Sequence, residues 1–281
     1  MSSLQLAAHL LNVGRPEDAL RELQRLGPDE AGSVNALCLR GYAHLNTGSL
    51  DAAVHDARAG LQAAPDDIEL HYLLSITETQ RGDLAAAEAA ILAALGYAAD
   101  DAELLAQYSR VLMRGGQLEK AGRVLAAAGA SDPRSQEVLR CRIDLAYLRG
   151  DTAEAEGLTH LLLADDAESV RGHQMLGVLA LERGDLPVAE TRLGEAVRLD
   201  PVHDEVADSA RAAQILQRPY YWPVRFFDRF GAAQTWVVAI CLILGLRAAG
   251  LTVAAGILGL TWMIVCAWSW AAGSRLEHQL R

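Results

Sequence analysis

Apolar residues recur at helical spacing along the front part of the chain, as in segments 68–81 and 170–183. Each such segment runs up to a glycine, and a second helical segment follows. The glycines are spaced 34 residues apart, at Gly14, Gly48, Gly82, Gly116, Gly150 and Gly184. This pattern predicts two helices per period, with the glycine taking the positive φ that ends the first helix.

Three further residue types keep the same period. An alanine small enough to let two helix backbones approach closely follows each glycine by five residues, at Ala19, Ala53, Ala87, Ala121, Ala155 and Ala189. Polar residues suited to cap the second helix follow the glycines, namely Ser49, Asp83, Asp151 and Asp185. Prolines that cannot continue a helix recur two periods apart, at Pro65, Pro133 and Pro201.

A two-helix unit of this length cannot bury its apolar face alone, so neighbouring units must stack. With its small residue, glycine and alanine at Gly41, Gly82 and Ala87, the sequence resembles a tetratricopeptide repeat array. The resemblance implies an all-α, right-handed superhelical solenoid of helix-turn-helix repeats. It covers residues 1–203 as six repeats, at 1–33, 34–67, 68–101, 102–135, 136–169 and 170–203, and segment 204–217 is predicted to be a capping helix.

The end of the chain has a different pattern. Segment 230–246 contains no charged residue over 17 positions, and segment 248–274 contains none over 27. At about 1.5 Å per residue, each can cross a hydrocarbon core roughly 30 Å thick. Two transmembrane helices are predicted at about 232–247 and 251–272, joined as a hairpin with Arg247 near the turn. One span with an interfacial helix, or a buried helix pair in a soluble domain, are the alternatives.

Aromatic and basic residues in segment 218–231 precede the first predicted span and suit a membrane interface. They are Tyr220, Tyr221, Trp222, Arg225, Phe226, Phe227, Arg229 and Phe230. Arg275 and Arg281 follow the second span, so the positive-inside rule predicts that the repeats and the tail 274–281 lie in the cytoplasm. Because Met1–Asn12 lacks a basic region, we expect no cleaved signal peptide. The composition suggests a bacterial inner membrane.

The net charge also differs between the repeat region and the end of the chain. The chain carries −11 overall, and residues 218–281 carry +4, so residues 1–217 carry −15. A surface this acidic argues against nucleic-acid binding. The four cysteines lie at least 25 residues apart, which excludes a zinc ribbon and a CxxC redox site.

No catalytic motif is present: the sequence lacks a P-loop, GxSxG, HExxH and a dinucleotide-binding glycine motif. His71 and His173 occupy equivalent repeat positions and are predicted to pack rather than to bind metal. Paired aspartates at 66–67, 100–101 and 165–166 are predicted to be loop and capping residues. We therefore expect no enzyme activity, no cofactor and no metal site.

The resemblance implies that function lies on a concave groove lined by the first helices. Its groove positions, ten, six and three residues before each glycine, together with one at the rim, give Tyr42, Tyr72, Ile76, Arg110, Met113, Arg114, Arg140 and Tyr147. Arginines bind carboxylates and tyrosines supply stiff contact area, so the expected partner is a protein or peptide with acidic and apolar residues. Alternatively, the tyrosines fill seams between repeats and the arginines pair with nearby acids.

Two functions are compatible with these features. The first is a membrane-anchored, non-enzymatic scaffold that presents the groove to a protein partner. The second is an accessory subunit of a transport, secretion or envelope-biogenesis complex, in which the transmembrane hairpin makes the specific contacts through small residues such as Gly250, Ala254 and Gly259. Homo- or hetero-oligomers are compatible with both.

Overall fold

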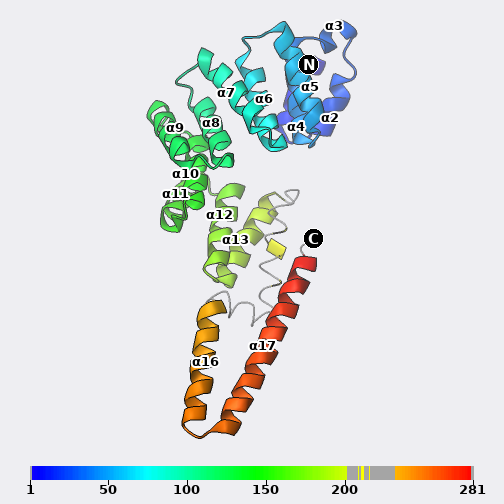
Figure 1. Cartoon of the computed structure of the whole chain (residues 1–281). Coiled ribbons are helices and arrows are strands. Elements are labelled where there is room, and N and C mark those ends of the chain that lie inside the picture. Colours follow the sequence, from blue (N-terminus) through cyan, green and yellow to red (C-terminus); the bar gives the residue numbers. More distant parts are fainter. Residues whose placement is uncertain (1, 201–207, 209, 212–214, 216–231, 280–281) are drawn as a thin grey trace. The chain divides into compact units, whose positions relative to one another are not determined.

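The computed structural model describes residues 2–200, 208, 210, 211, 215 and 232–279. It divides into two compact units, Met1–Ala155 and Glu156–Arg281 (Figure 1). The described part of the chain is built of helices and contains no strand. The predicted all-α helical repeat fold is therefore confirmed.

The first unit consists of consecutive helix pairs. Its helices are α1 (Ser3–Asn12), α2 (Pro16–Leu23), α3 (Pro28–Ala31), α4 (Val34–Asn46), α5 (Leu50–Ala63), α6 (Ile68–Arg81), α7 (Leu84–Tyr97), α8 (Ala102–Arg114), α9 (Leu118–Ser131) and α10 (Gln136–Leu148). The short helix α3 has no counterpart in the later periods and was not predicted. Helix α11 (Thr152–Asp165) begins at the end of this unit.

The second unit contains two helix pairs. The first pair is α12 (Val170–Glu182) and α13 (Leu186–Leu199), and the second is α16 (Ala232–Ala248) and α17 (Thr252–Gln279). Of the predicted capping helix 204–217, residues 208, 210, 211 and 215 are described and helical, and Ala210 packs against the cluster formed by Ala180, Ala189 and Leu193. The remainder of that segment, and Pro201, lie outside the described residues.

The periodic glycines end the first helix of each pair as predicted. All six have φ between 70° and 85°, a conformation that costs glycine little and other residues more. At Gly150, the turn is closed by two backbone bonds, from Gly150 N–H to the Tyr147 carbonyl at 2.9 Å and from Asp151 N–H to the Ala146 carbonyl at 3.0 Å. The glycine therefore fixes where each chain reversal occurs.

The predicted helix caps are confirmed at three positions and wrong at one. Asp83 and Asp151 accept hydrogen bonds from the backbone N–H three residues ahead at 3.0 Å, and Asp185 does so at 3.4 Å. Ser49 precedes α5 but caps no N–H group with its side chain. Its hydroxyl instead lies 3.4 Å from the Thr47 hydroxyl, which donates to it.

Close backbone approach holds the two helices of a pair together. The six periodic alanines are completely buried, with no exposed surface on any of them. Across from Ala53, a Cβ added at Gly41 would lie 2.6 Å from a Leu73 methyl and 3.7 Å from the Ala53 carbonyl oxygen. A side chain at Gly41 would therefore have to displace Leu73 of the next repeat.

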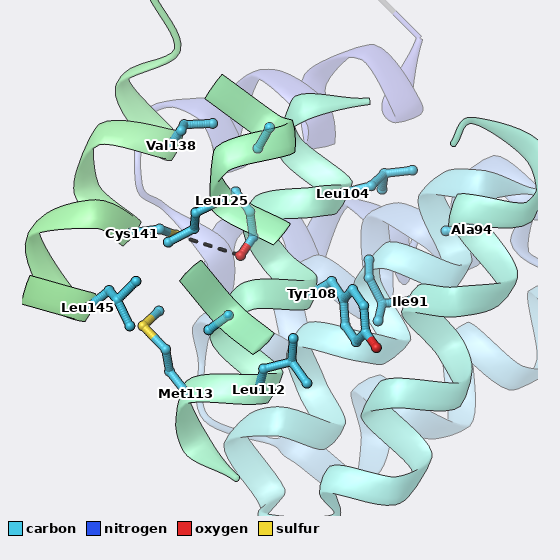
Figure 2. Close-up of a cluster of buried hydrophobic side chains, with 13 residues drawn as sticks. Ile91, Ala94, Leu104, Tyr108, Leu112, Met113, Leu125, Val138, Cys141 and Leu145 are labelled. Atoms are coloured by element: carbon cyan, nitrogen blue, oxygen red, sulfur yellow. Dashed lines mark hydrogen bonds between the residues drawn. The ribbon is translucent and has the colours of Figure 1, made fainter. Parts of the chain in front are cut away.

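Neighbouring pairs share one core. In Figure 2, Ile91 of α7, Leu112 of α8, Leu125 of α9 and Val138 of α10 belong to a single buried cluster. The Cys141 thiol, in the same cluster, lies 3.7 Å from the Ala106 carbonyl oxygen. Because three successive repeats contribute to this cluster, none of them buries its apolar face alone.

Ion pairs, of which one is centred on a buried carboxylate, also join helices at the junctions. The Glu78 carboxylate of α6 is fully buried and binds Arg58 of α5 at 2.8 Å and Arg81 at 2.7 Å. Arg81 also lies 3.2 Å from Asp51. The same relation recurs two periods later, where Arg149 lies 3.0 Å from Glu119. The arginine before the repeat glycine thus ties its helix to the preceding one.

Helices α16 and α17 form an antiparallel hairpin (Figure 1), reversed at Gly250, which has φ 80°. Arg247 lies in the last turn of α16 rather than in the connection itself. The rings of Trp236 and Trp262 are nearly perpendicular, with 6.2 Å between their centroids, and Ala239 and Ala255 are buried. Helix α17 continues as far as Gln279, into the segment predicted to be a tail.

Among the residues that the structure describes, one helix is long and apolar enough to cross a membrane. The span Thr252–Ala271 has a mean hydropathy of 1.7, and only 6% of its most apolar window is buried. Gln234–Ala248 is apolar but shorter. Most large apolar side chains of both helices are exposed, including Val253, Ile257 and Leu260.

We expect Ala87→Leu to lower the free energy of unfolding by about 1–3 kcal/mol, because three extra heavy atoms must enter a site with no free surface. Urea unfolding followed by circular dichroism measures this. Ala85→Leu, on the exposed face of the same helix, is the matched control and should change little. Equal stability of the two variants would contradict close backbone packing at Ala87.

Candidate functional site

Four consecutive first helices, α4, α6, α8 and α10, contact one another in series. We call the side that carries the predicted groove residues the first-helix surface. Each helix begins at a capped N-terminus, where Ser33, Asp67, Asp101 or Ser135 accepts a backbone hydrogen bond. The caps fix where each helix starts and so align equivalent residues along the surface.

Tyr42 of α4 reaches the next first helix. Its ring packs against the cluster that contains Leu45 and Leu73, and its hydroxyl donates a hydrogen bond to Glu69 of α6. Burial, followed by this bond to a carboxylate, raises the pKa of Tyr42. The hydroxyl is therefore a neutral donor already engaged within the protein.

Arg110 of α8 and Arg140 of α10 share one carboxylate. Arg110 forms an ion pair with Glu137, and Arg140 Nη1 lies 3.5 Å from Glu137 Oε2. The side chains remain 32% and 37% exposed, respectively. Two guanidinium groups and one carboxylate leave this cluster, the Arg110–Glu137–Arg140 cluster, with a formal charge of +1.

The buried side-chain amide of Gln107 binds Arg110. Gln107, only 1% exposed, accepts a hydrogen bond from Arg110 Nη1 at 3.3 Å through its Oε1. Its Nε2 donates to the hydroxyls of Ser75 and Thr79 on α6, both at 3.3 Å. The amide is thus engaged on both sides and connects Arg110 to the preceding repeat.

The remaining predicted groove residues differ in exposure. Met113 is 8% exposed and lies within the core cluster of Figure 2. Tyr72 packs partly against this cluster, and burial raises its pKa against the opposing effect of the Arg110 charge. Ile76 and Tyr147 are half-buried, and Arg114 is exposed at the end of α8. Met113 is therefore the buried member of the set, and Tyr72, Ile76, Arg110 and Arg140 are accessible members that lie on neighbouring first helices.

The predicted membrane-interface residues, Tyr220 to Phe230, lie outside the described residues. His71 and His173 are described, and each ring lies against a backbone carbonyl oxygen of the preceding link. His71 Nε2 lies 2.9 Å from the Pro65 carbonyl oxygen, and His173 Nε2 lies 3.0 Å from the Ala167 carbonyl oxygen. Within the described ranges, no group of three or more His, Cys, Asp and Glu side chains is placed to hold a metal ion.

The sequence analysis missed the acidic partners of the groove residues. Glu69, Glu103 and Glu137 are spaced by 34 residues, and each follows by 27 residues the position six before the preceding repeat glycine. This relation joins Tyr42 to Glu69 and Arg110 to Glu137. The residue 27 positions before Glu103 is Ile76, whose side chain has no hydrogen-bond donor. The recurrence was visible in the sequence, but the pairing needed the packing of successive helices.

Comparison with known proteins finds a repeat family that matches the first part of the chain. The family model described as tetratricopeptide repeat matches residues 4–68 and 38–103. A tetratricopeptide repeat protein from Parabacteroides merdae ATCC 43184 matches 75% of this chain and 83% of its own, with TM-score 0.69 at 15% identity. The Cut9-Hcn1 hetero-tetramer of the APC/C gives TM-score 0.62 at 14% identity, over 75% of this chain and 42% of that one.

PilW, a widely conserved type IV pilus biogenesis factor, gives TM-score 0.52 at 15% identity, over 65% of this chain and 92% of that one. No match is found among curated proteins. At these identities the solved structures support the fold alone.

Cys38 provides a test of burial on the first-helix surface. Burial, with smaller contributions from Glu69 and Asp67, raises its pKa to about 12. At pH 8 only about one thiol in 10⁴ is then ionised, so we expect alkylation by iodoacetamide to be slower by about a thousandfold than in the urea-unfolded chain. Peptide mass spectrometry measures the rate at this residue. Fast alkylation of the folded chain would show that Cys38 is not buried.

Proposed function

We propose that this chain, whose residues 4–103 match the tetratricopeptide repeat model, is a non-enzymatic scaffold that holds a protein or peptide partner at a membrane. Proteins of this family generally mediate protein–protein interaction through their repeats. The partner lies on the first-helix surface, and the C-terminal helices serve as the membrane anchor. The chain performs no chemistry of its own.

The Arg110–Glu137–Arg140 cluster is the observation that carries this proposal. It has a formal charge of +1 on a repeat domain whose net charge is strongly negative, and about a third of each arginine side chain is exposed. Tyr72 and Ile76, on the neighbouring helix, supply half-buried apolar surface. A peptide that carries both acidic and apolar residues is complementary to this combination.

The anchor is proposed from the hairpin of α16 and α17. Exposed apolar side chains on both helices favour a lipid environment over water. An antiparallel pair returns the chain to the side from which it entered. Basic residues flank the pair at Arg225, Arg229 and Arg275, so the proposed location of the repeats is the cytoplasmic face of a bacterial inner membrane.

A specific observation favours the second candidate function. A cavity of about 390 Å³ between α16 and α17 is lined mainly by apolar residues, including Val238, Leu242 and Trp262. A membrane subunit of a transport, secretion or envelope-biogenesis complex would insert a side chain there. PilW, which shares the repeat fold, is itself a pilus biogenesis factor.

We expect Arg110→Glu combined with Arg140→Glu to abolish partner capture, because both guanidinium donors become carboxylates. The measurement is affinity purification from gently solubilised membranes with mass-spectrometric identification, using the intact chain and the variant. A chain with an unrelated membrane hairpin in place of 232–273 serves as the second arm. If the chain with the unrelated hairpin loses its partners while the arginine variant keeps them, the result would favour the hairpin function instead.

We also expect the chain to remain in the membrane pellet after alkaline carbonate extraction. Ile257→Asp with Leu260→Asp places two carboxylates on the exposed apolar face of α17 and should release a large fraction, since each costs about 3 kcal/mol near a helix centre. Ile257→Leu with Leu260→Ile is the control. Complete extraction of the unaltered chain would contradict an integral anchor.

A further inference from the structure

The Arg110–Glu137–Arg140 cluster contains its own carboxylate. Glu137 engages Arg110 directly and reaches Arg140 at 3.5 Å, so it holds both of the donors offered to a partner. A carboxylate from a partner would need the same guanidinium N–H groups. The internal and external carboxylates therefore compete.

The two arginines stay in place when Glu137 leaves. Arg110 keeps its 3.3 Å bond to the buried Gln107, which is held by Ser75 and Thr79. Arg140 Nη2 lies 3.4 Å from Gln136 Oε1 on its own helix. These amides orient the guanidinium groups but do not neutralise them.

Displacement of Glu137 is also electrostatically feasible. Exchanging one carboxylate for another keeps the charge of the cluster unchanged. Glu137 lies in the first turn of α10, where the helix dipole stabilises a negative charge even without an arginine. The carboxylate is 23% exposed at the side-chain level and can turn toward solvent.

We propose that Glu137 is an internal competitor that occupies the position of a partner's carboxylate and sets the affinity of the first-helix surface for acidic peptides. This inference rests on the proposed function of that surface. It makes the surface selective, because a ligand must present a carboxylate in better geometry than Glu137 does in order to bind.

Glu103 offers a matched control within the same chain. It stands one period before Glu137, in the first turn of α8, and carries the same charge. The residue 27 positions before it is Ile76, which is uncharged, and no ion pair to Glu103 is found in the described ranges. Neutralising Glu103 therefore changes the surface charge as much as neutralising Glu137 does, but frees no arginine.

The experiment uses the intact chain in detergent and two fluorescein-labelled peptides. One alternates Glu and Leu, and the other has Lys in place of every Glu. Fluorescence anisotropy gives Kd for the unaltered chain, Glu137→Gln, Glu103→Gln and Arg110→Gln with Arg140→Gln. Circular dichroism confirms that each variant is folded, and Glu137→Asp, which shortens the carboxylate but keeps its charge, replaces Glu137→Gln should that variant unfold.

We expect Glu137→Gln to bind the acidic peptide about three- to fivefold more tightly than the unaltered chain, the range of an exposed ion pair, with a smaller change for Glu103→Gln. Equal gains in the two variants would show a general charge effect and overturn the inference, as would no gain in Glu137→Gln. If the double arginine variant binds the acidic peptide as well as the unaltered chain, the proposed binding surface itself is wrong. If binding of the acidic peptide requires the two arginines but Glu137→Gln does not bind it more tightly, the competitor role of Glu137 is refuted and the proposed binding surface is not.

Discussion

Close approach of helix backbones at the periodic alanines is the constraint from which the array follows. With no surface left on any of the six alanines, the two helices of a pair can meet in only one arrangement. The positive-φ glycine five residues earlier fixes the reversal that brings them together. Because every period repeats both conditions, equivalent first-helix positions recur in register along the first unit. Glu69, Glu103 and Glu137 can therefore each stand opposite the residue 27 positions earlier.

The helix pairs were largely predictable because their determinants are local. A glycine turn, an alanine contact and a capping aspartate each act within a few residues, and all recur at the same spacing. Ser49 does not cap α5, and its hydroxyl lies 3.4 Å from the Thr47 hydroxyl, a local contact that spacing alone does not reveal. The short α3 also escaped prediction, since it belongs to the link between two periods and has no periodic counterpart.

The candidate site was predictable only in part, because its chemistry depends on contacts between repeats. The family positions selected Arg110 and Arg140, but their common partner Glu137 and the buried Gln107 lie at positions that were not considered. Met113 was selected by the same rule and packs into the core cluster, since a position facing inward between two first helices can be filled by either a partner or a neighbouring repeat. The position of a residue within its repeat identifies it as a candidate for partner binding, and the packing of neighbouring repeats determines whether its side chain remains accessible to a partner.

Charge balance distinguishes the site from the ion pairs that join helices through a buried carboxylate in the first unit. Asp18 also pairs with two arginines, Arg15 and Arg21, but those side chains are 62% and 67% exposed and all three residues lie at one helix, α2. At the junction of α5 and α6, Arg58 and Arg81 face two carboxylates, Glu78 and Asp51, so the group is neutral. Arg40 binds the buried Asp56 through contacts of 2.6–3.0 Å, again one charge for one. Those pairs join helices and leave no excess charge for a ligand. At Glu137 the ratio is two arginines to one carboxylate, and both arginines are oriented by neutral amides. An unpaired positive charge is complementary to a further carboxylate, which is why this cluster, rather than the more deeply buried pairs, is the site proposed for a partner.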